Sequence, residues 1–145
     1  MKIEARQRDQ YPFIFPIQTR WADNDMYGHV NNVTYYSYFD TAANALLIQH
    51  AGFDIRNSEI IGLVVESQCQ FLQELSYPEI IEVGVAIAKL GNSSLRYDLA
   101  IFKQNQNHAS AQGHFVHVFV DRQTRKSTSI STEIRDALTA FLSVK

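Results

Sequence analysis

Residues 20–32 read RWADNDMYGHVNN and lead directly into VTYYSYFDTA, residues 33–42. The first part holds two carboxylates, a histidine, a glycine and three asparagines, a composition that favours a turn. The second part is mostly apolar and favours a helix. The first residues of a helix have unpaired backbone N–H groups at the positive end of the helix dipole, where an oxyanion can be stabilised. A carboxylate just before such a start is the minimal equipment for attacking an acyl carbonyl.

The segment from about Asn32 to Ala51 is predicted to be one long helix, because its apolar and small residues recur at helical spacing. Two adjacent stripes indicate burial over a wide arc, and they consist of Tyr35, Phe39, Ala42 and Leu46 and of Tyr36, Ala43 and Leu47. Asn31 or Asn32 is a suitable N-cap residue, and Gly52 is a suitable left-handed terminator. We expect this helix to occupy the centre of the fold.

Segments with a period of two are predicted to be strands. Residues 13–17 alternate before the motif, and Pro12 and Pro16 indicate an edge or irregular strand there. Four further strands are expected at residues 62–71, 81–88, 95–102 and 111–120. The short breaks at residues 91–92 and 105–108 predict that the last three strands pair as antiparallel hairpins. A short amphipathic helix that begins at Ser131 or Thr132 is expected near the end of the chain.

One strand, one long helix and about four antiparallel strands indicate an α+β fold, in which a curled sheet of about five strands wraps around one central helix. The chain of 145 residues fits one domain with a sizeable core, and neither a linker nor a repeat divides it. We therefore predict a single domain over residues 1–145, of which residues 1–11 form a polar leader.

The composition is that of an ordinary globular protein, with 46% apolar and 19% charged residues. A net charge of −2 gives no reason to expect nucleic acid or a membrane surface as the partner. The single cysteine, Cys69, excludes an intramolecular disulfide. The sequence has no apolar run of about 18 residues and no signal peptide at its start, so we expect a cytoplasmic location.

The pattern R-W-x-D-x-D-x-x-G-H-V-N-N-x-x-Y-x-x-Y-x-D, residues 20–40, resembles the signature of the hotdog-fold acyl-CoA thioesterases of the 4-hydroxybenzoyl-CoA thioesterase family. The resemblance extends over residues 12–141 and includes GLVVES at 62–67, LGNSS at 90–94 and QGHFVHVFVD at 112–121. It implies a hotdog thioesterase domain that hydrolyses an acyl-CoA to a carboxylic acid and free CoA. It also implies no metal, no cofactor beyond the coenzyme A of the substrate, and a homodimer or homotetramer.

Three residues are the predicted catalytic set. Asp25 matches the position at which this family places its carboxylate, which acts either as a nucleophile that forms an acyl anhydride or as a general base on water. Both routes are open, because the leaving thiol has a pKa near ~8.5 and departs without much help. Asn32 matches the position whose backbone N–H polarises the thioester carbonyl. His29 either orients Asp25 and the substrate or holds the turn structurally.

The other acidic residues receive different predictions. Asp23 is expected to order the loop by pairing with Arg20. Glu66, on the strand after the helix, is the rival catalytic carboxylate and a candidate for substrate binding. A metal site built from Asp23, Asp25 and His29 is disfavoured, since the loop offers no obvious fourth ligand.

Substrate binding is assigned to seven residues: Gly28, Asn31, Tyr35, Glu66, Ser93, Ser94 and Arg96. Some members of the resembled family carry basic residues in the turn that here reads Gly91-Asn92-Ser93-Ser94, where they meet nucleotide phosphates. This chain has no base in that turn, and the nearest cation is Arg96. The choice between coenzyme A and an acyl-carrier protein as the thiol therefore stays open.

Two other functions remain alternatives. Hotdog hydratases and dehydratases need a D-x-x-x-x-H or an H-x-x-x-x-x-P-G spacing; Asp25 and His29 are one residue too close for the first, and the second is absent. A non-catalytic acyl-binding module is the other alternative. His114 and His117 fall on opposite faces of one strand, so we interpret both as structural, and we interpret Cys69 as a small buried residue.

Assembly is predicted from the open sheet. A single curled sheet leaves an edge uncovered, and hotdog protomers usually close it by pairing. We expect the strand that ends at Asp121 and the start of the long helix to meet a partner.

Overall fold

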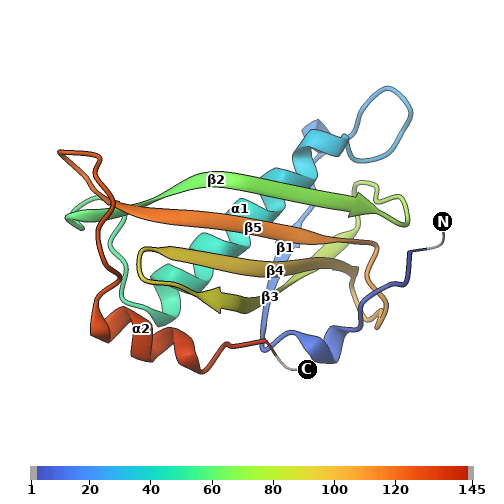
Figure 1. Cartoon of the computed structure of the whole chain (residues 1–145). Coiled ribbons are helices and arrows are strands. Elements are labelled where there is room, and N and C mark those ends of the chain that lie inside the picture. The colour runs from blue at the N-terminus through green and yellow to red at the C-terminus, as the bar shows by residue number, and fades with distance from the viewer. Residues whose placement is uncertain (1–2, 144–145) are drawn as a thin grey trace.

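The computed structural model describes residues 3–143 and contains one five-stranded antiparallel sheet (Figure 1). The strands are β1 (Phe13–Gln18), β2 (Ile60–Phe71), β3 (Ile80–Leu90), β4 (Ser94–Lys103) and β5 (Ala111–Asp121). Their order across the sheet is β1-β3-β4-β5-β2. This arrangement confirms the predicted hotdog fold.

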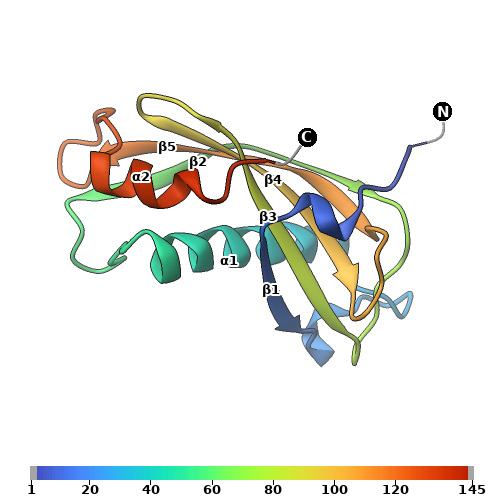
Figure 2. The same cartoon turned by 90° about the horizontal axis from the view of Figure 1, so that it is seen from below.

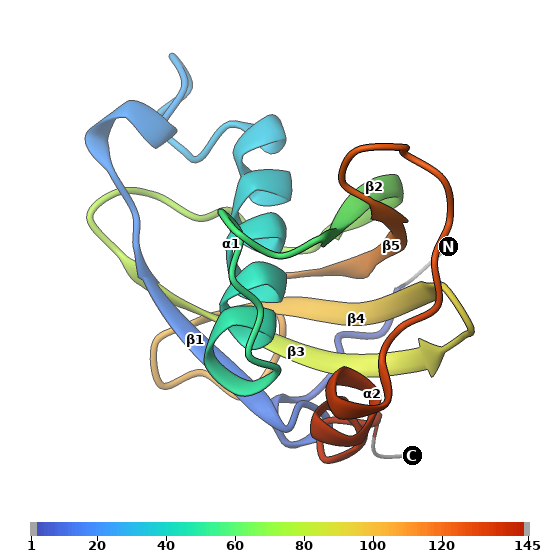
Figure 3. The same cartoon turned by 90° about the vertical axis from the view of Figure 1, so that its left-hand side faces the viewer.

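Helix α1 (Asn32–His50) lies along the concave face of the sheet (Figures 2 and 3). The Asn31 side chain caps its start, and Gly52, at φ +69°, ends it in the left-handed conformation, as the sequence predicts. The second helix, α2 (Thr132–Thr139), begins at Ser131, whose hydroxyl accepts a hydrogen bond from the N–H of Ile134. Within residues 3–143 no helix has the length and apolar character needed to cross a membrane.

The main core lies between α1 and the concave face of the sheet. Every second residue of β4 faces this core without measurable exposure: Leu95, Tyr97, Leu99 and Ile101. Phe39 and Leu46 of α1 pack against them and are equally buried. A smaller cluster on the convex face joins Tyr11 to Phe102, with ring centroids 5.9 Å apart, so the end of the polar leader packs against the sheet. The leader also contains a short 3-10 helix, η1 (Arg8–Gln10).

The two outer strands are β1 and β2. Strands β3, β4 and β5 form the consecutive hairpins that the short breaks predict. Between β1 and β2 the chain passes through α1 to the opposite edge of the sheet. There β2 pairs with β5, from Ile60 opposite Asp121 to Phe71 opposite Ala111. The strand that ends at Asp121 is therefore an interior strand, which corrects the expectation that it meets a partner at an open edge. The open edge on that side belongs to β2.

His117 and His114 lie on opposite faces of β5, as the alternation predicts. His117 faces the core, where its Nδ1 hydrogen-bonds with the hydroxyl of Tyr97 at 2.9 Å. Burial lowers the pKa of His117 to about 4. The neutral imidazole is thus a packing residue, and β2 passes so close to it that a Cβ on Gly62 would lie 3.2 Å from the ring.

The buried His117 predicts a loss of stability in acid. An unfolded histidine has a pKa near ~6.5, so below that pH the unfolded chain binds a proton that the folded chain resists. The stabilising contribution is complete above pH ~6.5 and is lost as the pH falls towards the folded-state pKa of about 4. We expect this residue alone to lower the free energy of unfolding by about 2 kcal/mol between pH 7 and pH 5.

Urea unfolding of the wild type and of His117→Gln at these two pH values measures the effect. The variant is expected to lose less stability than the wild type over the same interval, whatever its stability at pH 7. Equal losses in the two proteins would contradict the assignment.

Candidate active site

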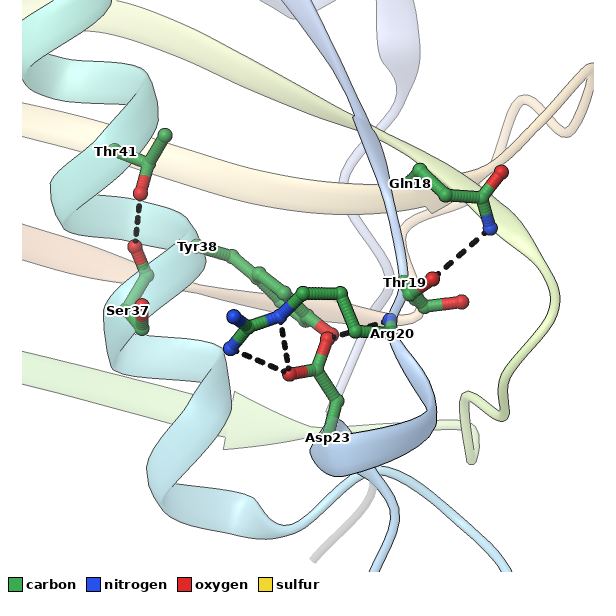
Figure 4. Close-up of polar contacts among 7 residues, drawn as sticks. All are labelled: Gln18, Thr19, Arg20, Asp23, Ser37, Tyr38 and Thr41. Carbon is green, nitrogen blue, oxygen red and sulfur yellow. Dashed lines mark hydrogen bonds and ion pairs between the residues drawn. The ribbon is translucent and has the colours of Figure 1, made fainter.

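A buried carboxylate organises the segment between β1 and α1. Asp23 ends the short 3-10 helix η2 (Trp21–Asp23) and is 2% exposed. Its carboxylate accepts hydrogen bonds from the backbone N–H of Arg20 at 2.9 Å, from the Arg20 guanidinium at 3.1 Å and from the hydroxyl of Tyr38 at 2.7 Å (Figure 4). The predicted pairing of Asp23 with Arg20 is confirmed, and Tyr38 ties both residues to α1.

Asp23 and Tyr38 each keep one protonation state at neutral pH. Burial by itself would raise the pKa of Asp23, but the hydrogen bonds from Tyr38 and Arg20 outweigh it and hold the pKa below its usual value. Burial, and then the adjacent carboxylate, raise the pKa of Tyr38. Asp23 is therefore an ionised structural carboxylate with its oxygens engaged by protein donors.

The following loop, residues 24–30, is attached to the connection between β2 and β3. The N–H of Val30 donates to the carbonyl of Leu75 at 2.7 Å, and the hydroxyl of Ser76 donates to the carbonyl of Gly28 at 2.8 Å. Gly28 has φ +88°, a conformation that favours glycine. The loop is held on one side by Asp23 and on the other by residues 75–76.

Asp25 lies on this fixed loop with its carboxylate 25% exposed. Its Oδ1 accepts a hydrogen bond from the N–H of Tyr27 at 2.8 Å, and its Oδ2 lies 4.0 Å from Nδ1 of His29. The other ring nitrogen of His29 lies 3.7 Å from Oε1 of Glu74. His29 is therefore placed between two carboxylates, one of which, Glu74, is a residue that the sequence analysis missed.

The start of α1 presents a free backbone donor beside this carboxylate. Asn31 is occupied, since its side chain accepts from the N–H of Val33 at 3.4 Å and its own N–H donates to the carbonyl of Asp23 at 2.9 Å. The N–H of Asn32 donates no hydrogen bond within residues 3–143. It is an unpaired donor at the positive end of a 19-residue helix.

One pocket of about 340 Å³ brings the predicted catalytic residues together. Its lining consists of Asp25, His29, Val30, Asn32, Tyr35, Phe71, Gln73 and Glu74. The rings of Tyr35 and Phe71 meet edge to face, with centroids 4.9 Å apart, and form an apolar wall. Across the part of the chain that the structure describes, no group of three or more His, Cys, Asp and Glu side chains is arranged to hold a metal ion.

Six of the seven predicted binding residues lie outside this lining: Gly28 and Asn31, on the adjacent loop and at the cap of α1, and four residues farther along the chain. Glu66 is on the convex face of β2, with Oε2 2.6 Å from Nε2 of His114. Arg96 belongs to the same cross-strand row of the convex face. Ser93 and Ser94 lie at the β3–β4 hairpin, where Ser94 pairs with Val118, near the opposite end of β5 from the pocket. Their roles in binding substrate stay predictions.

The comparison with known families agrees with this geometry. The model of the thioesterase-like superfamily matches residues 19–138, which include the whole pocket. The chain therefore belongs to the thioesterase-like superfamily.

Solved structures with the same fold include three informative relatives. The PA5185 protein of Pseudomonas aeruginosa strain PAO1 is 52% identical, with 96% of this chain and 97% of that chain covered and a TM-score of 0.94. The PA2801 protein of Pseudomonas aeruginosa, a proposed thioesterase, is 28% identical, with 88% and 98% covered and a TM-score of 0.80. The BH1999 gentisyl-coenzyme A thioesterase is 23% identical, with 87% and 99% covered and a TM-score of 0.78, a likeness of fold.

Proposed function

We propose that this protein hydrolyses acyl-CoA thioesters to a carboxylic acid and free coenzyme A. The observation that carries the proposal is one pocket lined both by the accessible carboxylate of Asp25 and by Asn32, whose backbone N–H is unpaired. Membership of the thioesterase-like superfamily supports thioester hydrolysis, and a gentisyl-coenzyme A thioesterase has the same fold. The narrower assignment to the 4-hydroxybenzoyl-CoA thioesterase family, which rests on the resemblance of residues 20–40, is part of this proposal.

In the proposed mechanism the carbonyl oxygen of the thioester accepts a hydrogen bond from the N–H of Asn32. The helix dipole and this donor stabilise the negative charge that develops on the oxygen. Oδ1 of Asp25 already accepts from Tyr27, so Oδ2 is the oxygen free to react. In one route it removes a proton from a water that attacks the carbonyl carbon, and the C–S bond breaks as the thiolate leaves. In the other it bonds to the carbonyl carbon itself, the C–S bond breaks as the thiolate leaves, and water then hydrolyses the resulting anhydride to the carboxylic acid.

His29 is proposed to keep the reactive oxygen in position. It lies within 4.0 Å of Oδ2 of Asp25 on one side and within 3.7 Å of Glu74 on the other, which limits rotation of its ring. Tyr35 and Phe71 exclude water from one side of the pocket. His29 acts on the position of Asp25, and Tyr35 and Phe71 act on the access of water to the pocket. None of the three takes part in the making or breaking of bonds.

A second copy of the chain is the proposed partner along β2. Three consecutive apolar side chains of this edge strand are exposed, Leu63, Val64 and Val65, and Val65 is 59% exposed. An open strand edge with apolar side chains is a template for pairing with another strand. Antiparallel pairing of two β2 strands about a twofold axis would bring the partner's Ile60 end beside Phe71 and hence beside the pocket. The proposed active site therefore lies at a dimer interface.

The first prediction on activity separates the two candidate carboxylates. Asp25→Asn keeps the size of the side chain and removes its charge, so turnover should fall by roughly a hundredfold or more while binding of acyl-CoA stays near that of the wild type. Glu66→Gln is the matched control. Because Glu66 lies outside the pocket, this substitution is expected to lower turnover only slightly. Release of free thiol from acyl-CoA measures both. A nearly inactive Glu66→Gln protein beside an active Asp25→Asn protein would reverse the assignment.

The second prediction tests the helix N-terminus. Proline deletes a backbone N–H and is tolerated in the first turn of a helix. Asn32→Pro should therefore stay folded and lower kcat by roughly a hundredfold, the usual scale for one lost oxyanion donor. Asn32→Ala keeps the N–H and should cost much less. If a proline variant with native circular dichroism hydrolyses acyl-CoA at the wild-type rate, the carbonyl is polarised elsewhere.

The third prediction concerns the partner. The wild type should sediment at micromolar concentration with at least twice the mass of the chain, and Val65→Lys should shift it towards the monomer and lower its activity, because a charge replaces an apolar side chain on the proposed interface. Ile55→Lys, at a residue 57% exposed that lines a groove with Phe15 of β1, the strand at the opposite edge of the sheet from β2, is the control that keeps the assembly. A wild-type monomer with full activity would contradict the proposed interface.

A further inference from the structure

Asp25 lies between two pockets. One is the pocket of about 340 Å³ described above, on the side of His29 and Glu74. The second has a volume of about 510 Å³ and is lined by Trp21, Asn24, Asp25, Met26 and Gly28. We call it the Trp21 pocket. Asp25 is the one residue common to the two linings.

The Trp21 pocket presents large apolar side chains to solvent. Trp21 is 81% exposed and Met26 is fully exposed. The ring of Tyr77 meets the indole of Trp21 edge to face, with centroids 6.1 Å apart, so the indole is supported while most of its surface remains free. Large exposed apolar side chains gathered in one place are typical of a binding site.

The free groups of this lining are apolar apart from Asp25 itself. The side-chain oxygen of Asn24 already accepts from the N–H of Tyr77 at 3.1 Å, and its amide nitrogen lies 3.5 Å from the Ser76 hydroxyl. Gly28 leaves its part of the wall open, because no atom would lie within 4 Å of a Cβ there. The lining contains no cation, so it is unsuited to the phosphates of coenzyme A.

We propose that the Trp21 pocket receives the acyl group of the substrate and that the pocket beside His29 and Glu74 receives the pantetheine arm. This inference rests on the proposed thioesterase function. The carbonyl carbon of a thioester carries two substituents that point apart, the acyl chain and the sulfur, and a carboxylate that attacks this carbon has one on each side. The two pockets that meet at Asp25 provide the two spaces, and the polar groups of Gln73 and Asn32 suit the amides of pantetheine.

The preferred substrates then carry an apolar acyl group, either aryl or medium-chain alkyl. A volume of about 510 Å³ is within the usual size of small-ligand sites.

Tryptophan fluorescence tests the proposal directly, because Trp21 is the single tryptophan of the chain. The Asp25→Asn variant is titrated with decanoyl-CoA, benzoyl-CoA and free CoA, and calorimetry determines saturation independently. Both acyl-CoAs should shift the Trp21 emission to shorter wavelength, because the exposed indole becomes covered. Free CoA should bind without this shift. An equal shift with free CoA, or no shift at saturating acyl-CoA, would overturn the proposal.

Kinetics of a Trp21 variant give a second test. Trp21→Ala should lower kcat/KM by about tenfold or more for decanoyl-CoA and benzoyl-CoA, and by less than about twofold for acetyl-CoA, because only the larger acyl groups reach the indole. Val33→Ala, at an exposed apolar residue that lines neither pocket, should show no dependence on acyl size.

The outcomes separate the two proposals. An equal loss for all three substrates, with a change in sedimentation, would show that a second copy covers Trp21 and would overturn the acyl-pocket proposal alone. Hydrolysis without the fluorescence shift also overturns only the acyl-pocket proposal. A wild-type protein that neither hydrolyses nor binds any of the acyl-CoAs would overturn the proposed function as well.

Discussion

The buried carboxylate of Asp23 is the interaction on which the geometry of the site depends. Its side chain joins Arg20, just after β1, to Tyr38, on the second turn of α1 (Figure 4). Its backbone carbonyl accepts from the N–H of Asn31. A carboxylate that is 2% exposed is tolerated only because the donors of Arg20 and Tyr38 compensate its lost hydration. Loss of Arg20 or Tyr38 would leave the charge of Asp23 short of a donor, and loss of Asp23 would leave the Tyr38 hydroxyl unpaired in the core. The strand, the loop and the helix are therefore fixed as one unit.

The positions of Asp25 and of the Asn32 N–H follow from this unit. Asp25 is two residues beyond Asp23, and Asn32 is one residue beyond the Asn31 amide that donates to Asp23. The loop between them is held from the other side by Leu75 and Ser76, so its two walls are independent anchors. A carboxylate and an oxyanion donor on such a support keep their separation without substrate, which is the condition for electrostatic preorganisation.

The sequence predicts the elements well where burial controls the pattern. The buried arc of α1 and the alternation of β4 are imposed by contact with one core, so they are visible as periods of 3.6 and 2. The order of strands is different, because a period of two is the same for an interior strand and an edge strand. For that reason the position of β2 outside β5 could not be predicted from the sequence.

Within the site, residues 23–35 were found because they form one continuous motif. Glu74 belongs to a connection with no motif and approaches His29 only through folding, whereas the placement of Ser93 and Ser94 away from the pocket depends on the register of β4 against β5.

The exposed apolar residues of the loop have the same physical origin as the fixed carboxylate. In a flexible loop, Trp21 and Met26 would bury themselves against the nearest apolar surface, since each gains free energy by leaving water. Here the backbone on both sides of them is held by buried or short polar contacts, at Asp23 and at Gly28, which prevents that collapse. Apolar surface that a rigid backbone keeps in water is stabilised by any ligand that covers it. The anchors that position Asp25 for reaction therefore also maintain an apolar surface beside it, and a substrate that covers this surface is bound against the reacting carboxylate.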